Sequence, residues 1–265
     1  MSTKAWDRVV LARKQDRPKA LDIIPRLFAS FYSLAGDRHF GDDKALVAGI
    51  GFFEGIPVTV LAQSKGRNLE ENMQCNFGML HPEGYRKAQR LALQAEKFNR
   101  PIITIIDTAG AYPGQMAEER GQAEAIASNL KLFSSLKVPV IAIVLSEGGS
   151  GGALALGVAD RVYMMENAIY SILSPEGFAS ILWKDDSRTE EAAELMECTA
   201  TDLLDKQIID AIIPEAMDGL EQNLNYSLEI IRNHIRKDLR DLKKLSSKKR
   251  LDLRYKKYRV MGKHL

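Results

Sequence analysis

Short apolar runs along the chain predict the strands of a largely buried sheet. Residues 101–106 and 138–145 are unbroken runs of β-branched and aliphatic side chains. Runs of this length without alternation are typical of strands that are buried on both faces. Residues 46–53 and 57–62 predict two further strands, and the short connection at 54–56 favours a hairpin between them.

Apolar residues at helical spacing predict the helices. This spacing covers residues 85–98, with Pro82 placed where a helix begins, and a longer segment from about 116 to 136. Residues 21–34 show the same spacing, although Pro25 limits or kinks a helix there.

The order of strand, glycine-containing loop and helix occurs twice, at residues 101–136 and 138–157. Two short predicted strands follow at 161–165 and 168–173, and Ser174 then caps a further helix. The repetition predicts a layered α/β fold with parallel strands. In such folds the functional site lies at the carboxyl ends of the strands.

The glycine-rich turn Gly148-Gly-Ser-Gly-Gly152 separates the run 138–145 from the helix-forming residues 153–156. Glycines at a strand-to-helix junction allow a sharp turn and let another molecule approach the backbone. They leave the first N–H groups of the helix unpaired at the positive end of its dipole, which favours negative charge. A flexible linker is the plainer interpretation, but a linker is not enclosed by two apolar runs.

The same turn satisfies the pattern G-x-S-x-G, in which Ser150 would be the nucleophile of a serine hydrolase. Such a serine needs a histidine and usually an acid. The histidine follows the serine in that fold, which leaves only His234 and His264, both in a strongly basic segment. A dinucleotide-binding fingerprint fails because Leu154 stands at the third glycine position.

Two glycine loops can instead act as oxyanion holes without a side-chain nucleophile. Gly110-Ala111 follows one predicted strand and Gly151-Gly152 follows the next. Backbone N–H groups in both loops can stabilise one developing oxyanion, such as the enolate of a thioester. Lys65 and Arg67 lie in a basic loop after residue 62, which is either part of a binding site or a solvated surface turn.

Composition limits the class of protein. With 265 residues and 45% hydrophobic content, the chain can form one large domain or a domain with an appendage. Its two cysteines, Cys75 and Cys198, exclude a disulfide framework and a four-cysteine zinc site within the chain. No apolar leader and no run approaching the ~20 residues of a membrane span is present. We therefore expect a cytoplasmic protein without a membrane segment.

The C-terminal tail differs from the rest of the chain in charge. Residues 228–265 carry 14 Lys/Arg against 4 Asp/Glu, whereas the remainder is acidic, with 23 against 31. Apolar residues recur at three- and four-residue intervals from Leu228 to Leu245, which predicts a helix with one apolar stripe. Nucleic-acid binding by the basic face is one interpretation. A helix that packs on the body or on a partner subunit explains the stripe better.

Several separate motifs resemble one family, the carboxyltransferase alpha subunit of bacterial-type acetyl-CoA carboxylase. The similarity extends from about residue 18 to residue 262. The motifs that carry it are His39-Phe-Gly-Asp-Asp43, Lys65-Gly-Arg67, Asn76-Phe-Gly-Met79, Pro82-Glu-Gly-Tyr-Arg-Lys87, Asp107-Thr-Ala-Gly-Ala-Tyr-Pro-Gly114, Ala117-Glu-Glu-Arg-Gly-Gln122, Glu147-Gly-Gly-Ser-Gly-Gly-Ala153 and Ser174-Pro-Glu-Gly177. The chain departs from the family at Ala109, where proline is usual, and in a much reduced N-terminal helical extension.

The resemblance implies a crotonase-like (ClpP/crotonase) fold of repeated ββα units. It also implies transfer of a carboxyl group from carboxybiotin, on a separate biotin carrier protein, to acetyl-CoA, giving malonyl-CoA for fatty acid synthesis. The implied assembly is an α2β2 heterotetramer that works with biotin carboxylase. Its beta subunit holds the CoA and a zinc ribbon, so no metal is expected in this chain. Another biotin-dependent acyl-CoA carboxyltransferase remains an alternative.

In this family the glycine loops of the alpha subunit face the biotin. The resemblance thus assigns catalytic N–H groups to Gly110, Ala111, Gly151 and Gly152, and substrate contacts to Lys65, Arg67, Gly148, Gly149 and Ser150. The expected organisation is an N-terminal helical segment over 1–35, a crotonase-like carboxyltransferase domain over 36–227 and a basic helical tail over 228–265.

Overall fold

The computed structural model describes residues 4–216 and 219–262, which are built around a mixed eight-stranded sheet. The strand order is β1-β2-β3-β4-β5-β6-β8, and β7 pairs with the end of β5. Strand β2 pairs antiparallel with both β1 and β3, whereas every strand pairing from β3 onward is parallel. The strands are β1 Ala29–Ser33, β2 Leu46–Phe53, β3 Ile56–Gln63, β4 Ile102–Thr108, β5 Val140–Gly149, β6 Arg161–Met165, β7 Ile169–Ser171 and β8 Ala211–Ile213.

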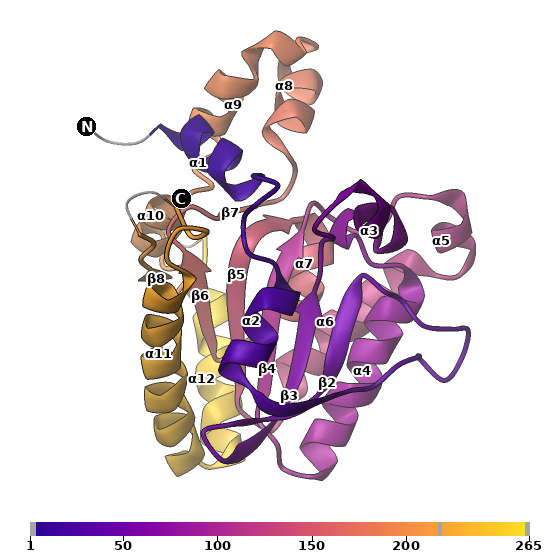
Figure 1. Cartoon of the computed structure of the whole chain (residues 1–265), viewed down its shortest axis with the longest axis vertical. Coiled ribbons are helices and arrows are strands. Elements are labelled where there is room, and N and C mark those ends of the chain that lie inside the picture. Colours follow the sequence, from indigo (N-terminus) through magenta and orange to yellow (C-terminus); the bar gives the residue numbers. More distant parts are fainter. Residues whose placement is uncertain (1–3, 217–218, 263–265) are drawn as a thin grey trace.

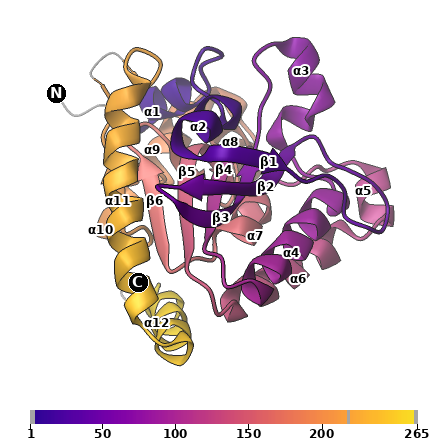
Figure 2. The same ribbon diagram turned by 60° about the horizontal axis from the view of Figure 1, so that its bottom comes forward.

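The helices form a layer against the sheet and two peripheral groups (Figures 1 and 2). Helix α6 packs on both α4 and α7, and α4 and α7 contact the strands, whereas α1, α8 and α9 project together beyond one end of the sheet. The helices are α1 Ala5–Ala12, α2 Ala20–Leu27, α3 Leu69–Gln74, α4 Pro82–Lys97, α5 Gln115–Glu119, α6 Gln122–Ser135, α7 Ser150–Gly157, α8 Pro175–Trp183, α9 Thr189–Leu195, α10 Ala200–Asp205, α11 Leu224–Lys244 and α12 Ser247–Val260.

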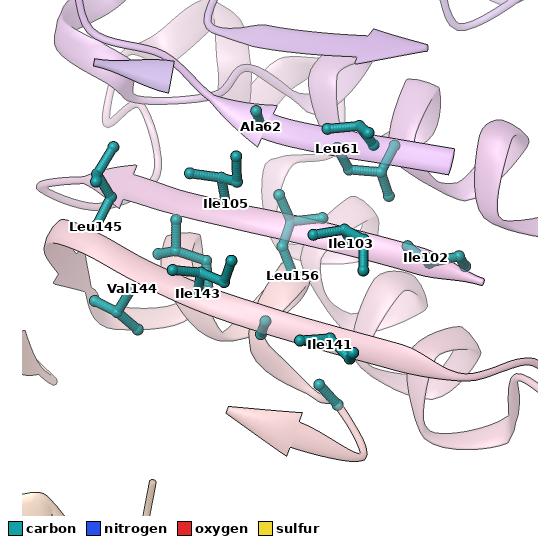
Figure 3. Close-up of a cluster of buried hydrophobic side chains, with 14 of the residues drawn as sticks. Leu61, Ala62, Ile102, Ile103, Ile105, Ile141, Ile143, Val144, Leu145 and Leu156 are labelled. Carbon is teal, nitrogen blue, oxygen red and sulfur yellow. The ribbon is translucent and has the colours of Figure 1, made fainter. Parts of the chain in front are cut away.

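The apolar runs of the sequence form the centre of the sheet, as predicted. Every residue of β4 and β5 is buried, and their isoleucines and valines pack with Leu61 and with Leu156 of α7 (Figure 3). The predicted hairpin is present as β2 and β3, paired from Leu46–Gln63 to Phe53–Ile56. None of the helices in the described ranges is long and apolar enough to cross a bilayer.

One predicted helix is wrong in its second half. Helix α2 ends at Leu27, and residues 29–33 form the edge strand β1, which pairs with β2. The segment 1–35 is therefore not helical throughout. The apolar residues among 28–34 fit the spacing of a helix as well as that of a strand. Pairing with the edge of β2 selects the strand.

A second predicted helix, residues 116–136, is divided into α5 and α6. The break lies at Gly121, which has φ +83° and ends the first helix. Glycine adopts this left-handed conformation without the steric cost that a side chain would add. The division lets Arg120 turn back to Glu83 of α4, at 3.0 Å.

The basic tail packs on the body through both of its helices. The apolar stripe of α11, including Leu228, Ile235 and Leu239, is buried. In α12, the side chains of Arg250 and Arg254 are buried and point into the protein rather than toward solvent. Part of the charge that suggested nucleic-acid binding is thus used in internal contacts. This packing agrees with the preferred interpretation of the tail. His264 lies outside the described residues.

Candidate active site

The structure brings the two predicted glycine loops into direct contact. A Cβ atom added to Gly152 would lie 2.4 Å from the carbonyl carbon of Gly110 and 2.5 Å from the nitrogen of Ala111. One added to Gly149 would lie 2.0 Å from the carbonyl oxygen of Ala109. The loop after β4 and the turn between β5 and α7 can therefore approach each other only because these positions lack side chains.

Strand β5 continues further than the apolar run predicts. It extends to Gly149 because Gly148 pairs with Thr108 of β4 and residues 147–149 pair with β7. The turn is consequently confined to Ser150, which has φ +52°. Helix α7 begins there, and no side chain caps it. Its first N–H groups are left at the positive end of the helix dipole.

The backbone donors of the two loops are not equivalent. The Gly110 N–H donates to Thr108 Oγ1 at 3.2 Å, and the same hydroxyl donates to the Gly110 carbonyl at 2.7 Å. The Ala111 N–H has no hydrogen-bond partner within residues 4–216 and 219–262. Ala111 and the first turn of α7 thus offer backbone donors side by side, at the place where the sequence predicts an oxyanion hole.

Lys65 lies in a buried ion cluster at the carboxyl ends of β3, β4 and β5. Its ammonium is 3.0 Å from Asp107 Oδ1 and also contacts Glu147. Burial opposes the charged form of this lysine, but the two carboxylates outweigh it and raise its pKa. The same balance lowers the pKa of Glu147, where burial is outweighed by Lys65 and Arg13.

The other predicted contacts are more exposed. Arg67 is about half exposed and pairs with Asp22 at 2.7 Å. Ser150 is exposed, and no hydrogen bond among the described residues joins it to a histidine. His81 instead contacts Asn76 and stacks on Tyr112, and His234 of α11 packs on Tyr163 of β6.

A cavity of about 320 Å³ adjoins this edge of the sheet. Its walls are the N-terminal segment, the loop after β3, and the ends of β4 and β5. The residues that line it include Arg13, Lys19, Lys65, Phe77 and Glu147. Lys19 is also buried, and burial lowers its pKa. The cavity is therefore lined mainly by cationic and neutral side chains, which suits an anionic group.

Two arginines of the N-terminal segment belong to the site and were not predicted. Arg13 Nε is 2.7 Å from Glu147 Oε1, and the buried Arg17 pairs with Glu215 and donates to the Leu145 carbonyl and to Ser146. The only sequence signal is a cluster of basic residues between 13 and 19, which is equally typical of a solvated surface. Within the described residues, no group of His, Cys, Asp and Glu is arranged to hold a metal ion.

Comparison with known families agrees with this geometry. Residues 1–262 match the family model described as acetyl co-enzyme A carboxylase carboxyltransferase-like. The chain belongs to this family. The family resemblance predicted from the motifs is therefore confirmed, and the serine hydrolase alternative is not supported.

Curated members of the carboxyltransferase family match nearly the whole chain. The acetyl-coenzyme A carboxylase carboxyl transferase subunit alpha of Halalkalibacterium halodurans is 54% identical over 259 residues, which are 98% of this chain and 80% of that protein. A protein of Natranaerobius thermophilus, named as subunits beta/alpha, is also 54% identical over 260 residues, which are 98% of this chain and 43% of that longer protein.

Solved structures support the crotonase-like fold. Transcarboxylase 12S aligns with a TM-score of 0.63 at 23% identity, over 79% of this chain and 40% of the transcarboxylase chain. The predicted α/β fold of the carboxyltransferase family is thus confirmed.

Proposed function

We propose that this chain is the alpha subunit of the carboxyltransferase component of acetyl-CoA carboxylase. One observation carries the proposal: the contact of the two glycine loops. It places the Ala111 N–H, which no described residue accepts from, beside the start of α7, which no described side chain caps. The curated relative from Halalkalibacterium halodurans, which is named for this function, is 54% identical over 98% of this chain. In this proposal, Gly110-Ala111 and Gly151-Gly152 provide backbone donors for an oxyanion.

The residues present fit a carboxylated biotin as the carboxyl donor. When bound, it supplies a transferable carboxyl group and a urea oxygen that gains negative charge as the group leaves. Gly110 has no atom within 4 Å of the place of a side chain, and Gly151 has Ile126 Cγ2 at 3.5 Å, so a flat ring can approach the backbone at these two positions closely. The positive end of the α7 dipole favours the same charge. The Gly110 N–H must release Thr108 before it can donate, so Ala111 is the stronger candidate in that loop.

We also propose the partners that this chemistry requires. A zinc-ribbon beta subunit would hold acetyl-CoA opposite the glycine loops in an α2β2 heterotetramer, and a biotin carboxyl carrier protein charged by biotin carboxylase would deliver the biotin. The fusion of beta and alpha subunits in the Natranaerobius relative supports a beta partner. Lys65 and Arg67 were expected to contact substrate. The pairing of Lys65 with two carboxylates favours a role in shaping the site instead.

The isolated chain is expected to form no measurable malonyl-CoA from acetyl-CoA and carboxylated biotin, because half of the site is missing. Activity should appear when the beta subunit is added, at a rate that saturates with its concentration. The measurement is a coupled malonyl-CoA assay on each chain separately and on the mixture. Turnover by this chain alone, with the beta subunit shown to be absent by mass spectrometry, would contradict the proposal.

Ser150→Ala distinguishes this function from serine hydrolysis. The substitution removes an exposed hydroxyl while keeping the Cβ, so the backbone at φ +52° carries no added strain. Carboxyl transfer by the assembled enzyme should stay within about threefold of the original. If Ser150 were a nucleophile, its loss would lower the rate by several orders of magnitude.

A further inference from the structure

Five charged side chains form a continuous chain around the two glycine loops. Lys65 Nζ is 3.0 Å from Asp107 Oδ1 and also contacts Glu147 Oε2, and Glu147 Oε1 is 2.7 Å from Arg13 Nε. Arg13 Nη1 is in turn 2.6 Å from Glu176 Oε1. We call this set the ion chain; its members, in order, are Asp107, Lys65, Glu147, Arg13 and Glu176.

The carboxylates of the ion chain lie next to the two glycine loops of the candidate active site. Asp107 lies at the end of β4, shortly before Gly110, and Glu147 directly precedes Gly148. Glu176 lies in the first turn of α8, whose start borders the cavity beside Gly148. The cations come from elsewhere in the sequence, so the ion chain ties the loops to segments that are distant along the chain.

Burial decreases along the ion chain. The side chain of Asp107 is completely buried, Lys65 and Glu147 are 13% and 11% exposed, and Arg13 and Glu176 are 32% and 42% exposed. The inner members cannot be changed without leaving a charge buried and unpaired. Arg13 is different because its partly exposed position lets water replace its contacts at a small cost in stability.

Arg13 can fix both the distance between the Glu147 and Glu176 carboxylates and their relative orientation. Its Nε donates to Glu147, and its two terminal nitrogens donate to the two oxygens of Glu176, at 2.6 and 3.3 Å. A guanidinium holds its donors in one plane, whereas a lysine ammonium is a single point of charge. One rigid group thus connects the residue before the glycine turn with the first turn of α8.

We propose that Arg13 is a positioning residue for carboxyl transfer: by holding Glu147 and Glu176 together, it sets the Gly148–Gly152 turn against Gly110-Ala111. The activity part of this inference rests on the proposed function, but the positioning part does not. Arg13 itself touches neither loop's N–H groups in this structure and acts through Glu147.

Arg8 offers a matched control. It lies on helix α1, which ends directly before Arg13, its side chain is 19% exposed, and it binds Glu166 at 3.6 Å and the side chain of Asn167. Neither partner is a member of the ion chain. Arg8→Gln therefore removes an arginine of the same segment, one that is also partly exposed, without touching the ion chain.

Hydrogen exchange of the isolated chain tests the positioning without any activity. In Arg13→Gln, peptides covering residues 147–153 should exchange at least tenfold faster, because local opening of the turn becomes easier. The thermal midpoint should fall by no more than it does in Arg8→Gln, and exchange in 147–153 should be unchanged in that control. Unchanged exchange in Arg13→Gln would overturn the inference, whether or not the chain is a carboxyltransferase.

Kinetics of the assembled enzyme tests the consequence for catalysis. Arg13→Gln should lower kcat by on the order of a hundredfold, as expected for a small misplacement of the reacting groups, with KM for acetyl-CoA changed less than threefold. Arg13→Lys should recover only part of kcat, since lysine cannot bind Glu147 and Glu176 in the same geometry. Full activity in Arg13→Gln, together with faster exchange, would show that the turn need not be held for catalysis.

The pH profile separates positioning from loss of folded protein. Glu147 faces Lys65 from the loop after β3, Arg13 from the N-terminal segment and Asp107 of β4, whose Oδ1 accepts the Glu147 N–H. Burial raises the pKa of Glu147, and the two cations together hold it below its usual value. Without Arg13, that pKa rises, so the acid limb of kcat should move to higher pH. A profile that is lower but unshifted would mean that Arg13 only stabilises the fold.

Discussion

Replacing Gly152 by alanine is expected to remove most carboxyl transfer. The new Cβ would lie 2.4 Å from the carbonyl carbon of Gly110, 2.5 Å from the Ala111 nitrogen and 2.8 Å from the Gly110 oxygen. These are backbone atoms, so the two loops must separate to admit the methyl group. Loss of an aligned oxyanion donor typically lowers kcat by a hundredfold or more, and we expect a decrease of roughly that size. The measurement is kcat of the purified complex with its beta subunit.

Gly151→Ala is the control for this prediction. Its Cβ would meet only Ile126 Cγ2, at 3.5 Å, which is an ordinary contact. The decrease in kcat should therefore stay below about tenfold, although both glycines belong to the same motif. Circular dichroism and co-purification with the beta subunit would verify that each variant folds and assembles. Equal rates for the two variants would mean that the contact between the loops is not needed.

Arg254→Met is expected to cause the largest loss of stability. Arg254 forms two hydrogen bonds with Asp160, at 2.9 and 2.7 Å, and donates to three backbone carbonyls, those of Phe133, Leu136 and Val138. The two side chains are 1% and 3% exposed. Removing one partner leaves a buried carboxylate without its counter-charge, which costs about 3–5 kcal/mol of the free energy of unfolding.

Urea unfolding of the isolated chain measures this loss. Arg259→Met, an exposed change on the same helix α12, should alter the free energy of unfolding by less than about 0.5 kcal/mol. The Arg254 variant should also release the tail from the body, which limited proteolysis near residues 245–247 would reveal. A loss below about 1 kcal/mol in Arg254→Met would contradict the view that α12 is anchored by this ion pair.

The sequence by itself determined the strands and helices that have a clear apolar pattern within their own residues. The unbroken apolar runs of β4 and β5, the hairpin β2–β3 and helix α4 were predicted correctly, because each is long and its periodicity is unambiguous. The glycine turn after β5 was recognisable for the same reason. Its motif, with those around it, was specific enough to indicate the family.

The tertiary structure decided the features that depend on distant contacts. Residues 29–33 became a strand only because β2 offers an unpaired edge. Likewise, Gly149 and Gly152 are sterically critical whereas Gly151 is not, and this depends on where the loop after β4 passes. No periodicity along the chain encodes such an approach.

The ion pairs of the charged residues are also features that the sequence does not predict. The sequence predicted that Lys65 contacts the substrate or lies in a solvated loop, and it predicted no role for Arg13. Both residues instead bind Glu147, which is 82 and 134 residues away along the chain, respectively. The strength of an ion pair depends on the distance between the charges and on their burial, and the local sequence predicts neither. The sequence alone therefore determined where the glycine loops lie along the chain, whereas only the folded chain, by bringing distant charges together where little water reaches them, decided which charged side chains pair beside those loops.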